Sequence, residues 1–234
     1  MSTLFSTLVD SYGPDKRDVL ATSRGNVDMV FLGHASLLFH IDNKLIYVDP
    51  SGAYAKIDHL PKADLIIVTH EHFDHLDPKA VEYLSKPETE IIATEQCKSI
   101  RPTLVMKNGD KTTFDGITIE AVPAYNLVHK NDKGEFFHPK GRGNGYVLTV
   151  GDKKIYIAGD TENIPEMSTL KDIDVAFLPM NLPYTMDASM FVDAVKRVKP
   201  KVVYPYHYKG SNPNVAKEML KDYTSAEVRI KNFY

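Results

Sequence analysis

Three histidines and an aspartate lie within six consecutive positions, from His70 to His75. Imidazole nitrogen and carboxylate oxygen are ligands that zinc and related divalent ions prefer. In an extended chain His70 and His72 point to the same side, and after a turn Asp74 and His75 can reach a neighbouring position. Such side chains make a poor core, so the segment predicts a metal site. It is not a His-Glu-x-x-His motif, because Asp74 stands where the second histidine would be, and a zincin protease is therefore disfavoured.

Two further candidate ligands follow runs with strand character. Asp160 comes directly after an apolar run and after Gly159, which allows tight backbone at that point. His207 follows a second apolar run and is flanked by tyrosines. Alone, Asp160 could be a turn residue and His207 a histidine packed among aromatic rings. Together with the His70–His75 segment, both are predicted to be metal ligands.

Other polar residues near these motifs have more than one interpretation. Asp49, before Pro50, stands where a carboxylate could orient a ligating imidazole, although a turn-forming Asp-Pro pair explains it equally well. His34 could lie beside the ligands and orient one of them, but it is interpreted more simply as a core histidine with satisfied hydrogen bonds. Tyrosines such as Tyr206 could line a pocket around metal ions or only pack.

The elements that must position these residues are short strands with helices between them. Turn residues separate the apolar runs, and helices that fall between strands indicate layered α and β elements. The predicted strands are 27–32, 36–41, 44–48, 64–69, 90–94, 117–122, 145–150, 154–158, 174–178, 201–204 and 227–231. The predicted helices are 79–85, 188–198 and a third that begins at the Asn212-Pro213 pair.

The chain contains an internal similarity. The segment 44–49 resembles 154–160, because in both an apolar strand ends on an aspartate. This predicts two similar halves packed sheet to sheet, with functional groups at the strand ends. No linker or change of composition divides the chain, so a single domain spanning 1–234 is expected. The long irregular stretch 123–144 is of a length that often carries function.

In these motifs the sequence resembles the metallo-β-lactamase superfamily. The resemblance rests on the His-x-His-x-Asp-His segment from His70, on Gly159-Asp-Thr161 after a strand, and on the late strand-end histidine His207. The early Gly33-His-Ala35 and the Asp49-Pro50 pair resemble the small stand-alone hydrolases related to the ascorbate-6-phosphate lactonase group. The family resemblance implies an α/β fold, a four-layer αββα sandwich of two similar halves.

The resemblance also implies a set of ligands. His70 and His72 match the ligands of a first metal ion, Asp74, His75 and His207 those of a second, and Asp160 the carboxylate that bridges both. This sequence departs from the family pattern at one point, since Asn126 stands where a third histidine for the first ion is common. Asn126 or a water could complete that site, or His129 or His138 from the same loop could replace the missing imidazole.

The implied activity is hydrolysis by a metal-bound hydroxide, with Asp74 and Asp160 as the catalytic carboxylates. The expected cofactor is zinc, as two ions, with manganese or iron as alternatives, and the expected substrate is an ester, a lactone or a phosphodiester. Two other functions stay open. One is a non-catalytic metal-binding protein with a degenerate site, and the other is a di-iron redox protein.

The composition of the chain limits the possible functions and locations. A formal charge of −3 argues against a dedicated nucleic-acid binder, so a small-molecule substrate is expected. The single cysteine, Cys97, excludes an internal disulfide and fits a reducing cytoplasm. Residues 1–10 lack the basic region and the long apolar run of a signal peptide, and no stretch approaches a membrane span. The sequence does not indicate an oligomeric state.

Overall fold

The computed structural model describes residues 12–234, and these form two compact units. The first comprises residues 12–106 and 231–234, and the second residues 107–230. The prediction that residues 1–10 carry no signal peptide concerns a segment outside the described part. None of the helices in that part is long and apolar enough to cross a membrane.

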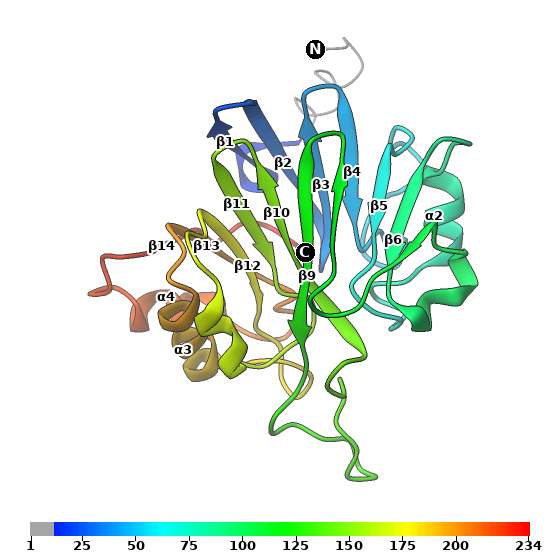
Figure 1. Ribbon diagram of the computed structural model, residues 1–234. Coiled ribbons are helices and arrows are strands. Elements are labelled where there is room, and N and C mark those ends of the chain that lie inside the picture. Colours follow the sequence, from blue (N-terminus) through cyan, green and yellow to red (C-terminus); the bar gives the residue numbers. More distant parts are fainter. Residues whose placement is uncertain (1–11) are drawn as a thin grey trace. The chain divides into compact units, whose positions relative to one another are not determined.

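The first unit is built on a seven-stranded mixed sheet whose strands follow chain order (Figure 1). They are β1 (Arg17–Thr22), β2 (Gly25–Gly33), β3 (Ser36–Ile41), β4 (Lys44–Val48), β5 (Leu65–Ile67), β6 (Glu90–Ala93) and β7 (Leu104–Val105). Neighbours from β1 to β4 pair antiparallel, and those from β4 to β7 pair parallel. The unit also carries α2 (Pro78–Leu84) and the 3₁₀ helices η1 (Pro14–Lys16) and η2 (Glu95–Ile100).

The second unit repeats this plan. Its strands are β8 (Lys111–Phe114), β9 (Ile117–Ala124), β10 (Gly143–Val150), β11 (Lys153–Ile157), β12 (Val175–Pro179), β13 (Val202–Tyr206) and β14 (Glu227–Val228). Neighbours from β8 to β11 pair antiparallel, and those from β11 to β14 pair parallel. The helices are η3 (Pro165–Thr169), α3 (Ala188–Val198) and α4 (Pro213–Met219). Because each sheet switches from antiparallel to parallel at its fourth strand, the prediction of two similar halves is confirmed.

A polar side chain caps the start of each α-helix. The Asp77 carboxylate accepts a hydrogen bond from the Lys79 backbone N–H at the start of α2, and Asp187 accepts one from the Met190 N–H in α3. At α4 the Asn212 side chain has the same role. The helix predicted for 188–198 is present as α3, and its apolar stripe is buried in the second unit's own core.

Three strands were not predicted from the sequence. They are β1, β7 and β8, and each of them lies at an edge of its sheet. Side chains of β1 alternate between half-buried and exposed, so its sequence lacks the apolar run that identified the central strands. The irregular stretch is also shorter than predicted, because β9 extends to Ala124 and β10 begins at Gly143.

Polar side chains gather just past the ends of central strands in each unit. Asp49 follows β4 and His70 follows β5 in the first unit. Asp160 follows β11 and His207 follows β13 in the second unit. Carboxyl ends of parallel strands meet at one edge of a sheet, so each unit brings its polar residues together at that edge.

Candidate metal centre

The chain after β5 turns tightly and gathers the predicted histidines of the first unit. The His75 backbone N–H donates to the His72 carbonyl at 2.9 Å, which closes the turn. The ring centroids of His70 and His72 lie 4.7 Å apart, and those of His70 and His75 lie 4.1 Å apart. His70 and His75 are buried. Several imidazoles therefore share a small volume inside this unit.

Asp49 orients one of these imidazoles. Its Oδ2 lies 2.7 Å from His75 Nδ1, and both side chains are completely buried. The Thr69 backbone N–H donates to Asp49 Oδ1, and the Thr69 hydroxyl to Oδ2, each at 2.7 Å. Because a carboxylate only accepts, His75 carries its proton on Nδ1 and keeps a lone pair on Nε2. Of the two interpretations of Asp49, the structure supports the carboxylate that orients an imidazole.

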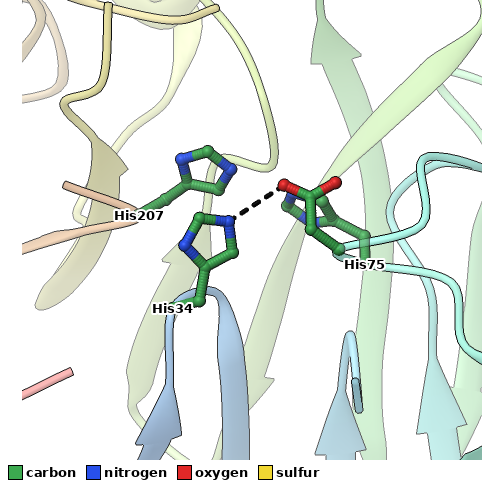
Figure 2. Close-up of side chains that lie close together, drawn as sticks. His34, His75 and His207 are labelled. Atoms are coloured by element: carbon green, nitrogen blue, oxygen red, sulfur yellow. Dashed lines mark hydrogen bonds and ion pairs between the residues drawn. The ribbon is translucent and has the colours of Figure 1, made fainter. Parts of the chain in front are cut away.

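His34 also contacts the motif, which supports the alternative in which it orients a ligand over that of a histidine that only packs in the core. Its Nε2 donates to Asp74 Oδ2 at 2.9 Å, the contact that is dashed in Figure 2, and Tyr234 Oη lies 2.6 Å from its Nδ1. His34 has a φ of 53°, an uncommon conformation for a residue other than glycine. His34, Asp74 and His75 each offer a ligand atom within 4.8 Å of the others. His34 therefore positions the Asp74 carboxylate.

In the second unit Asp160 lies between two histidines. Its Oδ2 is 3.2 Å from His138 Nε2 and 3.4 Å from His207 Nε2, and all three side chains are almost fully buried. Two ligands held about 2.1 Å from a tetrahedral zinc lie roughly 3.4 Å apart. The spacing and chemistry of these donors therefore fit divalent metal ions.

The backbone at Asp160 is fixed by its neighbours. Gly159 has a φ of 65°, so the predicted tight backbone is confirmed at this position. The Gly159 N–H donates to the hydroxyl of Tyr206 at 2.9 Å. Tyr206 is fully buried, and it thus supports the turn that presents Asp160.

Asn126 holds His138 with its side-chain oxygen. Asn126 Oδ1 accepts the His138 backbone N–H at 2.7 Å and lies 2.8 Å from His138 Nδ1. Its Nδ2 donates to Glu162 Oε1 and to the Tyr184 carbonyl, each at 2.9 Å. With the proton on Nδ1 facing Asn126, His138 presents the lone pair of Nε2 toward Asp160. These contacts favour His138 over Asn126 as the additional ligand.

The other candidate histidine of this loop has a different partner. His129 Nδ1 lies 2.8 Å from Glu162 Oε1, and its backbone N–H donates to the same oxygen. The backbone N–H groups of Leu127 and Val128 donate to Glu162 Oε2 at 2.7 and 2.8 Å. Glu162 is completely buried, and it was not singled out from the sequence. Its position two residues after Asp160 is the only signal that the sequence offered.

Hydrogen bonds keep Glu162 ionised. Burial by itself raises the pKa of this carboxyl, but donors from His129, Asn126, Leu127 and Val128 outweigh it and lower the pKa below its ordinary value. The carboxylate therefore ties the loop after β9 to the segment that carries Asp160.

Replacing this carboxylate tests its role. We expect Glu162→Gln to lower the free energy of unfolding by about 1–3 kcal/mol at pH 7, because buried donors lose a charged acceptor. A lowered folded-state pKa contributes stability above the unfolded-state pKa, and this contribution is lost as the pH falls through the folded value. The difference from wild type in urea unfolding should therefore shrink in acid. Glu88→Gln, at an exposed position, is the control, and equal stability at pH 7 for Glu162→Gln would contradict the role.

The donor set favours metal chemistry over a thiol nucleophile. Burial raises the pKa of the Cys97 thiol, and Cys97 packs in the core of the first unit. The structure thus brings His70, His72, Asp74 and His75 together in the first unit, and Asp160, His207 and His138 together in the second.

Comparisons with known proteins agree with these features. A family model described as "Beta-lactamase superfamily domain" matches residues 28–207. A "UPF0173 metal-dependent hydrolase" of Thermococcus onnurineus is 34% identical over 87% of this chain and 96% of its own length. The crystal structure of a protein described as a metal-dependent hydrolase from Parabacteroides distasonis is 47% identical, with a TM-score of 0.88 over 93% of this chain and 99% of that one.

A metallo hydrolase from Ignicoccus hospitalis is similar at 26% identity, with a TM-score of 0.73 over 88% of this chain and 95% of that one. The likeness to these solved structures extends over almost the whole of each chain. The α/β metallo-β-lactamase fold predicted from the motifs is therefore confirmed.

Proposed function

Because this chain belongs to the beta-lactamase superfamily and is one of its metal-dependent hydrolases, we propose that it uses zinc, as two ions, to hydrolyse an ester, a lactone or a phosphodiester of a small molecule. The proposed ligands are His70, His72, Asp74, His75, Asp160 and His207, with His138 as the additional imidazole. Asn126 is proposed to position His138 rather than to bind metal. The charge of −3 and the single cysteine support a small-molecule substrate and a cytoplasmic location.

The observation that carries this proposal is the position of Asp160 Oδ2. It lies within 3.4 Å of the Nε2 atoms of both His138 and His207. One carboxylate with an imidazole on either side is suited to contact two cations at once. Asp160, His138 and His207 would hold a divalent ion there, which would lower the pKa of a bound water and stabilise the charge that develops on the substrate oxygen.

The protein groups have separate tasks in this proposal. Asp74 and Asp160 accept hydrogen bonds from the attacking water and orient it toward the substrate. His34 fixes the Asp74 carboxylate through a 2.9 Å hydrogen bond, and Asp49 fixes the ring of His75. Side chains held in this way lose little freedom when the substrate binds, which lowers the barrier by positioning.

Metal content and activity together test the proposal. We expect His70→Ala and His207→Ala each to lose bound metal by mass spectrometry, because each removes a ligand, while circular dichroism stays that of the wild type. The exposed His59→Ala is the control and should keep full metal content. Full metal stoichiometry in either ligand variant would show that the assignment is wrong at that position.

A substrate screen tests which reaction the protein catalyses. We expect the metal-loaded wild type to hydrolyse at least one of a set of generic lactones, carboxylic esters and phosphodiesters. Bound iron with redox activity and no hydrolysis would favour the di-iron alternative, since the same donors suit iron. Bound metal with neither activity would favour the non-catalytic alternative.

A further inference from the structure

The second unit contains a cavity of about 300 Å³ away from the proposed metal ligands. Its walls come from β9, β10 and β11 and from η3 with the residues that follow it. The apolar part of the lining is Val122, Val147, Met167, Leu170 and Ile173. This volume is at the lower end of the range of small-molecule sites, so a compact ligand fits it.

Tyr156 on β11 supplies a polar group to this apolar lining. The side chain is 1% exposed, and its hydroxyl makes no hydrogen bond to any residue between 12 and 234. Burial raises the pKa of the Tyr156 hydroxyl, so the group stays protonated and keeps a hydrogen to donate. Because no residue of the described part accepts from it, this hydroxyl can donate to a ligand in the cavity.

Two lysines add positive charge to the same cavity. Lys154 Nζ donates to the carbonyl of Lys171 at 3.0 Å, and Lys171 Nζ donates to the carbonyl of Ser168 at 3.1 Å. Within the described part of the chain, neither ammonium group forms an ion pair with a carboxylate. Each ammonium has three donors, so both keep hydrogens for a ligand.

The carboxylates of the lining are already neutralised. Glu166 pairs with Lys140 at 2.7 Å and accepts a hydrogen bond from the Tyr125 hydroxyl. Glu120 pairs with Lys111 at 3.1 Å. The charge left at the cavity is therefore positive and comes from Lys154 and Lys171.

From these features we propose that the cavity binds a small carboxylate with a compact apolar body. Lys154 and Lys171 would hold the carboxylate, the apolar body would lie against Val147 and Met167, and the Tyr156 hydroxyl would donate to a polar atom of the ligand. The site is separate from the proposed ligands and does not depend on the proposed hydrolysis.

The probe for this site is 4-bromobenzoate, with the neutral 4-bromobenzamide as its isostere. We expect calorimetric titration of the metal-loaded full chain to give tighter binding of the carboxylate. Lys154→Met and Lys171→Met should each weaken it by about tenfold, because each removes a charge-assisted contact. Tyr156→Phe should weaken it by about threefold through loss of one neutral hydrogen bond. The anomalous signal of bromine in a crystal should lie in the cavity.

Lys153→Met is the matched control, because Lys153 neighbours Lys154 in sequence but pairs with Asp152 at 2.7 Å and does not line the cavity. It should leave the affinity unchanged. Equal binding of the amide and the carboxylate, lysine variants with wild-type affinity, absence of binding, or bromine found only beside Asp160 would each overturn the proposal. The last result would show a ligand of the metal centre instead.

Discussion

Asp160→Asn is expected to reduce bound metal from two ions to about one, and to lower any hydrolytic rate by at least about 100-fold. Asparagine keeps the shape of the side chain but removes the negative charge nearest to both proposed ions. Two dications held about 4 Å apart would repel by roughly 16 kcal/mol at an effective dielectric constant of 20, so the loss of this negative charge would matter greatly. Mass spectrometry measures the metal content, and an assay with the best substrate of the screen measures the rate.

The control for this variant is Asp193→Asn. Asp193 is a half-exposed carboxylate on α3 that pairs with Arg197, and it has no part in the proposed centre. It should keep two ions and the wild-type rate. Two tightly held ions in Asp160→Asn would refute the bridging role, whereas one ion with an unchanged rate would mean that a single ion suffices for the reaction.

The sequence predicted those parts of the centre that are local in the chain. His70, His72, Asp74 and His75 lie within one turn, so their spacing alone indicated that they gather. Asp160 and His207 are proposed as ligands because each follows an apolar run, and strand ends bring such residues to one edge of a sheet. The comparable segments at 44–49 and 154–160 likewise predicted the two halves, since both are the fourth strand of a seven-stranded sheet.

Contacts between distant or irregular segments were not predictable in this way. His34 contacts Tyr234, which lies 200 positions later in the sequence, and no local pattern links the two. Asn126 and His138 approach each other across a loop without periodicity, so the sequence left Asn126, His129 and His138 as candidates for the additional ligand. Their positions differ, because Glu162 Oε1 lies 2.8 Å from His129 Nδ1, whereas His138 Nε2 lies 3.2 Å from Asp160 Oδ2.

The strands that the sequence did not predict lie at the edges of the two sheets, and the reason is related. A central strand such as β5 is covered on both faces, and its sequence is a continuous apolar run. An edge strand such as β8, with the sequence Lys-Thr-Thr-Phe, carries little apolar pattern, and its pairing with β9 is what makes it a strand. Its existence depends on pairing with β9, and sequence patterns do not reveal which segments pair.

His138→Ala is expected to release about one metal ion, whereas His129→Ala should retain both, although the two histidines belong to the same loop. The difference follows from geometry, because His138 Nε2 lies 3.2 Å from Asp160 Oδ2 and His129 Nδ1 faces Glu162. Asn126→Ala keeps both imidazoles but removes the oxygen that orients His138, so metal affinity should fall by roughly 10–100-fold. Competition with the chelator dipicolinate measures all three variants. Metal loss in His129→Ala with full retention in His138→Ala would reverse the assignment and make Glu162 the group that positions a ligand directly.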